Sequence, residues 1–178
     1  NIASMKSLKK SSIQNSESNS EAIYKLDSLS IGFHKMHKLL FVYFVTGNET
    51  AKTEVRKEIS DVAEGVTNNI EEYEKSIDKK NAKDVNSFNT FKERYDALYK
   101  KYMESLKLCE DDIGGAIQMA NDELAPLVDK TESSINALTE AIQNEIAESN
   151  KSQAQTFDMT IRMSVIQIIV SVIISVIA

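Results

Sequence analysis

Apolar side chains recur every three or four residues along most of this sequence. One such series comprises Val55, Ile59, Val62, Val66, Ile70, Tyr73 and Ile77. This spacing keeps all members on one face of an α-helix, whereas a strand would alternate apolar and polar residues. The 178 residues contain one proline and five glycines, too few for a sandwich or barrel that turns every ~8 to 12 residues. The sequence therefore predicts an all-α protein.

Three further series with the same spacing give four helical segments in total. They are Leu26, Leu29, Phe33, Met36, Leu40, Tyr43; then Phe88, Phe91, Tyr95, Leu98, Tyr102, Leu106, Cys109; then Ile117, Ala120, Leu124, Val128, Thr131, Ile135, Leu138, Ile142, Ile146. Turn-forming residues separate the segments at 46–48, 80–83 and 111–115. Short links between long helices make neighbours antiparallel. We predict an up-down-up-down four-helix bundle over residues 1–160.

The first and fourth segments are longer than the other two. At ~1.5 Å per residue, the second and third span roughly 40 to 47 Å, and the first and fourth roughly 68 Å. The excess of roughly 20 Å should project from one end of the bundle. Within residues 6–21 of the first segment, Leu8 and Ile13 are the only large apolar residues, so we expect a frayed or partner-supported helix there.

Residues 163–178 contain no charge, glycine or proline, and every charged residue lies at or before Arg162. Their polar side chains, Ser164, Gln167, Ser171 and Ser175, recur at helical spacing. In lipid such a stripe would contact a partner helix while the Ile and Val side chains face the acyl chains. A membrane span needs ~20 residues, so we interpret residues 161–178 as the truncated start of a transmembrane helix. The alternative is a buried C-terminal core helix.

Composition excludes several function classes. A net charge of −6 argues against nucleic-acid binding, which requires a basic face. A lone cysteine, Cys109, allows neither an internal disulfide nor a multi-cysteine metal site, and leaves the redox compartment open. The two histidines lack the further ligands of a metal centre. With no phosphate loop or nucleophile elbow, we expect neither cofactor nor catalysis.

The first helical segment is apolar around nearly its whole circumference between Met36 and Val45. A bundle helix needs only one buried stripe, and Ile31, Phe41 and Val45 lie away from it. We predict that these three residues form the interface of a symmetric homodimer. The alternative is a thicker core in which this helix is the most central.

Four basic or titratable side chains, His34, Lys35, His37 and Lys38, lie within one and a half turns of the same segment. Neighbouring cations repel one another unless they are solvated or matched by an anion. In an acidic protein the cluster predicts a pocket for an anion or carboxylate at the dimer interface. The alternative is a solvated flank whose lysine stems cover apolar surface.

Two stretches carry a resemblance to a known family. They are FHKMHKLLFVYFVTGNETAKTEV in the first and second segments and LAPLVDKTESSINALTEAIQNEIAESNKSQAQTF in the fourth. Together with the long outer helices and the apolar C-terminal run, they resemble the extracytoplasmic sensory domain of bacterial methyl-accepting chemotaxis proteins. The resemblance implies a homodimer packed through helix one in the cell membrane, a first membrane helix before residue 1, and a cytoplasmic signalling part after residue 178.

The resemblance also implies a ligand site. In members that sense aspartate or serine, arginines on helix one hold the ligand carboxylate, and residues beside a proline near the start of helix four bind its amino group. Pro126 and Leu127 stand at that place, and helical rise puts residues 34–38 at the same level. This sequence has no arginine on helix one, and Leu127 replaces a small hydroxyl residue. We therefore expect a small ligand, a carboxylate or other anion, to bind through residues that differ from those of the aspartate- and serine-sensing members.

These observations predict a sensory domain that binds a small molecule and signals through helix four into the membrane. Two alternatives remain open at this stage. The bundle is also typical of the input domain of a sensor histidine kinase. A tail-anchored helical protein that acts in membrane fusion or pore formation would show a similar pattern.

Overall fold

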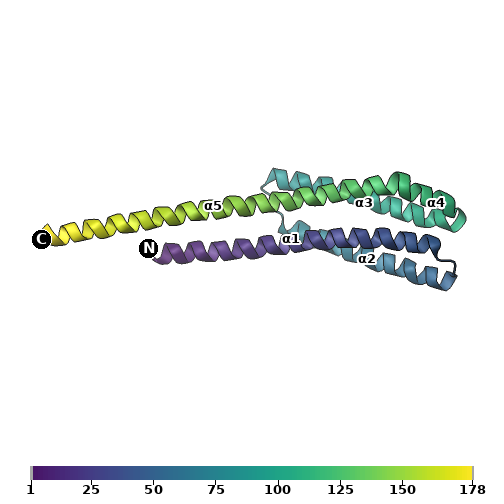
Figure 1. Ribbon diagram of the computed structural model, residues 1–178, viewed down its shortest axis with the longest axis horizontal. Coiled ribbons are helices and arrows are strands. Elements are labelled where there is room, and N and C mark those ends of the chain that lie inside the picture. The colour runs from purple at the N-terminus through teal and green to yellow at the C-terminus, as the bar shows by residue number, and fades with distance from the viewer. Residues whose placement is uncertain (1, 178) are drawn as a thin grey trace. The chain divides into compact units, whose positions relative to one another are not determined.

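The computed structural model describes the backbone of residues 2–177 and the side chains of residues 17–169. In chain order the elements are α1 (Ile2–Val45), α2 (Glu49–Ser76), α3 (Ala82–Asp111), α4 (Ile113–Met119), the π-helical η1 (Ala120–Leu124) and α5 (Ala125–Ile177) (Figure 1). Residues 2–177 contain no strand. The predicted all-α class is confirmed, with α4, η1 and α5 joined end to end as the fourth helix.

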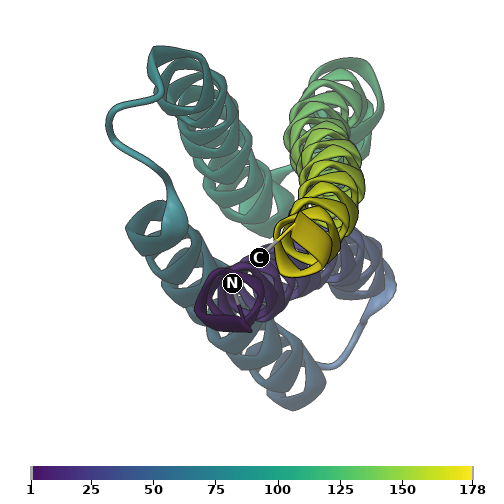
Figure 2. The same cartoon turned by 90° about the vertical axis from the view of Figure 1, so that its left-hand side faces the viewer.

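The chain forms two compact units. One unit comprises residues 20–142 and the other comprises residues 1–19 together with 143–178. The first unit holds the four-helix bundle, in which neighbouring helices run antiparallel (Figure 2). Helix α1 has 44 residues against 28 in α2 and 30 in α3, so the predicted difference in helix length is confirmed.

Side-chain caps set where the helices begin. Asn48 accepts hydrogen bonds from the backbone N–H groups of Thr50 and Ala51, which places the first turn at 46–48 as predicted. The second turn comprises residues 77–81 rather than 80–83, because Asp78 forms a turn with Lys80 and Asn81 caps α3. The third is shorter than the predicted 111–115, because only Asp112 leaves the helical path and it caps α4 at once.

A π-helical turn precedes the single proline. Pro126 has no N–H to donate, and its ring would clash with the carbonyl of Asp122, four residues earlier. In η1 the Ala125 N–H donates to the Ala120 carbonyl, five residues back. The wider turn accommodates the proline without interrupting the helix. Helix four is therefore continuous but not uniformly α-helical.

The bundle core is built on aromatic contacts of α3. Phe33 of α1 is fully buried, with ring centroids 6.3 Å from Phe91 and 5.5 Å from Tyr95. Tyr73 of α2 lies 5.8 Å from Phe88. All six predicted core residues of α1 are buried, namely Leu26, Leu29, Phe33, Met36, Leu40 and Tyr43. In α2, Ala63 is buried where the pattern had placed Val62, and Ile117 of α4 is 36% exposed while Ala116 is buried.

Polar contacts at the surface identify which helices are neighbours. Lys35 of α1 pairs with Glu58 of α2 at 2.8 Å. Arg94 of α3 donates to the Lys130 carbonyl of α5 at 2.9 Å. Exposed pairs of this kind contribute little to stability, but they show which positions of neighbouring helices lie at the same height.

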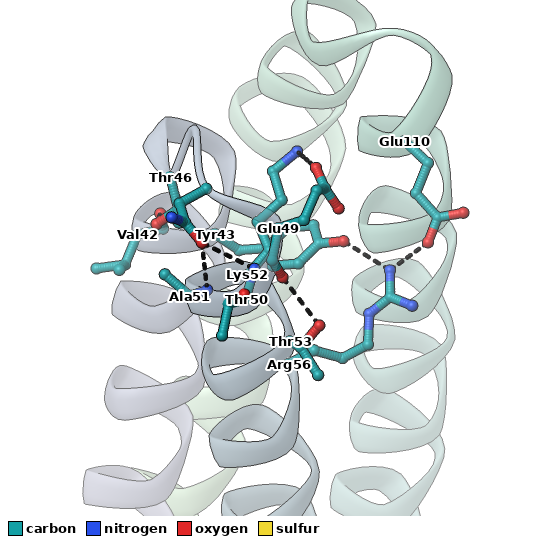
Figure 3. A network of polar contacts seen from close by, with 11 residues as sticks. Val42, Tyr43, Thr46, Glu49, Thr50, Ala51, Lys52, Thr53, Arg56 and Glu110 are labelled. Carbon is teal, nitrogen blue, oxygen red and sulfur yellow. Dashed lines mark hydrogen bonds and ion pairs between the residues drawn. The ribbon is translucent and has the colours of Figure 1, made fainter.

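A further contact joins three helices around the α1–α2 turn (Figure 3). The Arg56 guanidinium of α2 donates to the Tyr43 hydroxyl at 2.6 Å and to the Glu110 carboxylate of α3. It also lies over the Tyr43 ring, 5.4 Å from the centroid. The hydrogen bonds to Glu110 and Tyr43 raise the pKa of Arg56 and outweigh the opposing effect of burial. This contact fixes the end of the bundle at which α1, α2 and α3 meet.

The second unit contains the first part of α1, which is helical from Ile2, and the last part of α5, which is helical as far as Ile177. Side chains of α5 become half-buried in a stripe at Ile146, Ser149, Gln153, Thr156 and Thr160. The large apolar side chains outside this stripe are 47% to 66% exposed, namely Phe157, Met159, Ile161, Met163, Val165, Ile166, Ile168 and Ile169.

The predicted membrane segment, residues 163–178, is described only in part. The Ser164 hydroxyl donates to the Thr160 carbonyl of its own helix at 2.9 Å. Ser171 and Ser175 lie outside the residues whose side chains are described. Across the part of the chain that was searched, no helix is both long and apolar enough to cross a membrane.

Replacing Gly32 by alanine tests the close approach of α1 and α2. A Cβ at position 32 would lie far inside van der Waals distance of Val66 Cγ2, so we expect Gly32→Ala to lower the unfolding free energy by roughly 1 to 3 kcal/mol. Gly65→Ala is the matched control because a Cβ there meets nothing within 4 Å, and we expect a gain of roughly 0.5 to 1 kcal/mol. Urea unfolding followed by circular dichroism measures both, and equal effects would contradict this packing.

Candidate functional site

The four neighbouring cationic positions of α1 face different surroundings. His34 is 63% exposed, and its Nε2 lies 2.5 Å from Glu132 Oε1 on α5. Lys35 pairs with Glu58 on α2, the opposite flank of α1. His37 is half-buried and Lys38 is exposed. The structure therefore separates the predicted cluster, because consecutive helical positions point around the helix.

The carboxylates of Glu132 and Glu58 balance two of these four positions. In the predicted anion pocket, a ligand would have made the contacts that these two side chains make. Lys38 forms no ion pair among the residues whose side chains are described, whereas His34 and Lys35 each meet a carboxylate. Anion binding here stays a prediction, now centred on Lys38 with His34 beside it.

His37 is directed into the bundle. Its ring makes edge contacts with Phe41, 5.1 Å between centroids, and with Tyr102 of α3, 6.3 Å. Its Nδ1 is buried and has no hydrogen-bond partner within the described part of the chain. Burial lowers the pKa of His37, the charge of His34 lowers it further, and Asp129 of α5 acts in the opposite direction.

Tyr102 supplies the second unsatisfied polar group of this region. The side chain is 1% exposed, and its hydroxyl has no hydrogen-bond partner within the described residues. Burial raises the pKa of the phenol well above its ordinary value, so the hydroxyl is neutral at physiological pH. Tyr95 is also buried, but its hydroxyl lies 3.4 Å from that of Thr67.

Pro126 is exposed and Leu127 is half-buried on α5. Glu132, which meets His34, lies six residues further along the same helix, or about 9 Å at helical rise. Because α1 and α5 are antiparallel, Pro126 is level with a position about six residues beyond His34. Of the predicted cations, Lys38 therefore lies nearest to Pro126 in height along the bundle. His34 lies about two helical turns from the height of Pro126.

The three predicted dimer residues differ in exposure. Ile31 and Val45 are 68% and 80% exposed. Phe41 is half-buried because its ring packs on His37 and, at 5.7 Å, on Phe44. Tyr24, which the sequence reasoning missed, is 72% exposed. Its position exactly one heptad before Ile31 was the signal that would have identified it.

The sequence reasoning also missed the acidic partners of the histidines. Asp129 and Glu132 lie three residues apart on α5, the same spacing as His34 and His37 on α1. The sequence shows this shared spacing, but it does not show the register between α1 and α5 that brings the two pairs together. Among the described residues, no group of three or more histidine, cysteine or acidic side chains is placed to hold a metal ion.

The comparison with known families identifies the architecture. Residues 1–157 match the four-helix-bundle sensory module for signal transduction of methyl-accepting chemotaxis proteins. The chain belongs to this family. The match includes both predicted site segments, on α1 and at the start of α5, and the family is a sensory signalling module rather than an enzyme family. No curated protein matches the sequence.

Tyr102→Phe tests the buried, unpaired hydroxyl of this sensory module. Removing a polar group that has no partner removes its desolvation cost, so we expect the unfolding free energy to rise by about 1 kcal/mol. Tyr95→Phe is the matched control, because it removes a hydroxyl that contacts Thr67 and should give no gain. Urea unfolding of the two variants measures the difference, and a loss of stability in Tyr102→Phe would show that the hydroxyl has a partner.

Proposed function

We propose that this chain is the extracytoplasmic sensory domain of a transmembrane chemotaxis receptor. The match of residues 1–157 to the sensory-module family carries the proposal. The bundle supplies the input, and α5 connects it to the apolar residues that follow. The domain faces the outside of the cell membrane in this proposal.

The apolar C-terminal residues, 163–178, serve as the membrane contact. Side chains on every side of α5 between Met163 and Ile169 are exposed in the isolated chain. A helix that is apolar around its circumference is stable when lipid or protein covers it. Ser164, Gln167, Ser171 and Ser175 would then face a partner helix, where small polar groups permit close approach.

A homodimer packed through α1 accounts for the exposed apolar side chains of that helix. Tyr24, Ile31 and Val45 are at least 68% exposed and lie 7 and 14 residues apart, with Lys38 at the heptad position between Ile31 and Val45. This heptad spacing is typical of a helix that pairs with another along one seam. A two-fold axis would bring the same stripe from each protomer together, with Phe41 at its edge.

The ligand of the proposed receptor is a small carboxylate or other anion bound between α1 and α5. Lys38 forms no ion pair among the described side chains, and both Lys38 and His34 are exposed. A ligand carboxylate would contact Lys38 and compete with Glu132 for His34. Pro126 and Leu127 would form the wall of this site on α5.

The signal passes along α5 in this mechanism. The helix is continuous from Ala125 to Ile177, so a small displacement near the ligand reaches the C-terminal residues without a flexible link. Ligand binding selects the displaced state to the extent that it binds that state more tightly.

A thermal-shift screen of amino acids and organic acids against residues 1–178 tests the ligand site. A binder raises the midpoint with its concentration relative to its dissociation constant, and we expect Lys38→Ala to abolish the shift. Lys35→Ala is the control because Lys35 pairs with Glu58 on the opposite flank. A binder whose shift survives Lys38→Ala would exclude this site.

Two glycines at positions 149 and 150 test transmission along α5. The residues there are Ser149 and Asn150, and each glycine costs a helix interior about 1 kcal/mol relative to alanine. The test uses a hybrid of this chain with the cytoplasmic part of a characterised chemoreceptor. We expect Ser149→Gly with Asn150→Gly to leave ligand affinity unchanged and to abolish the effect of the ligand on the kinase that the cytoplasmic part regulates. The control places alanine at both positions. Equal output from the two hybrids would refute rigid transmission.

A further inference from the structure

Both histidines of the chain face a pair of carboxylates on α5. His34 Nε2 lies 2.5 Å from Glu132 Oε1, and His37 interacts electrostatically with Asp129. Each pair of residues is separated by three positions, and the helices are antiparallel. The antiparallel register therefore places Asp129 level with His37, one helical turn from the contact of His34 with Glu132.

The two histidines differ in burial. His34 is 63% exposed, so its ring is open to solvent. His37 is half-buried against Phe41 and Tyr102, and its buried Nδ1 has no partner within the described residues. Among the described residues, Asp129 is the carboxylate that favours a proton on His37.

We propose that His34, His37, Asp129 and Glu132 form a proton-binding site whose occupation strengthens the attachment of α1 to α5, making acidification a stimulus of the receptor. The inference rests on the proposed sensory function and names the proton as one of its ligands. Histidine is the side chain that changes charge between about pH 5 and 8. The four residues join the ligand-facing helix to the helix that transmits the signal.

Within the described part of the chain, the titratable groups that act on His37 lie on α1 and α5. His34 on its own helix repels a proton there, and Asp129 on α5 attracts it. Tyr102 on α3 stays neutral, because burial raises its pKa. Helix α2 presents Glu58 to the opposite flank of α1, where Lys35 pairs with it.

The two protonation steps favour the same contact for different reasons. A proton on His34 turns its contact with Glu132 into a charge-assisted pair. A proton on His37 requires either approach of Asp129 or rotation of the ring from the Tyr102 side toward α5. Either movement increases the contact between α1 and α5.

The sign of the stability change follows from burial. The pKa of His37 is lowered in the folded chain, so the unfolded chain takes up this proton first. The stability that neutral His37 gives the folded chain is present above about pH 6.5. It is lost as the pH falls toward and through the pKa of His37 in the folded chain. Acid therefore weakens the packing of His37 on α3 while the ion pairs to α5 form.

Proton NMR of the two histidine rings in the full chain of residues 1–178, held in lipid nanodiscs, tests the site directly. We expect the His37 midpoint to lie below about 6.5, to rise in His34→Gln and to fall in Asp129→Asn. Glu58→Gln, on the other flank, is the control and should leave it unchanged. A His37 midpoint that neither His34→Gln nor Asp129→Asn moves would overturn the proposal.

The hybrid receptor tests whether the site is a stimulus. External acidification from about pH 7.5 to about pH 5.5 spans the histidine range, and we expect it to change kinase output. His34→Gln with His37→Gln should abolish the response, and Lys35→Gln should retain it. Circular dichroism checks that the double variant folds, and Asp129→Asn, which leaves both rings in place, should also reduce the response.

The outcomes separate this inference from the proposed function. A hybrid that responds to the amino acids and organic acids of the screen but not to pH overturns the proton site alone. A pH response that survives His34→Gln with His37→Gln overturns it as well. A hybrid that responds to neither, although its cytoplasmic part is active, overturns the proposed function.

Discussion

The contact of Phe33 with Phe91 and Tyr95 fixes the rotation of α1 in the bundle. The Phe33 side chain is fully buried between α1 and α3. Once that side chain points inward, helical geometry directs its neighbours: His34 faces α5 and Lys35 faces α2. Ile31 and Val45 are left outside. The polar flanks and the exposed apolar stripe of α1 therefore both follow from the packing of Phe33 in the core.

The side-chain environment changes along α5 from the bundle toward the C-terminal residues. Residues as far as Ile142 include fully buried side chains, and residues 146–160 carry a half-buried stripe that is mostly polar. From Met163 the described side chains are apolar and exposed. Among the residues whose side chains are described, the fully buried ones thus lie in the unit of residues 20–142.

Much of the candidate site was visible in the sequence, but its partners were not. The cations of α1 and Pro126 were identified from residue types and helical rise alone. Glu58 and Glu132 were missed because they lie 23 and 98 positions from the residues they contact, Lys35 and His34. Which carboxylate meets which cation depends on the lengths of the turns and on the π-turn before Pro126. A shift of one residue at either would present a different face of α5.

The sequence by itself determined the helical class, the four-helix topology and the buried stripe of α1. These properties are periodic and local, since apolar spacing and turn-forming residues act over a few positions. Only the tertiary structure decided that His34 and His37 divide between surface and interior, and that Asp129 and Glu132 face them. Those relations depend on register and rotation between helices distant in sequence. No local pattern encodes them, because they result from packing the whole bundle core at once.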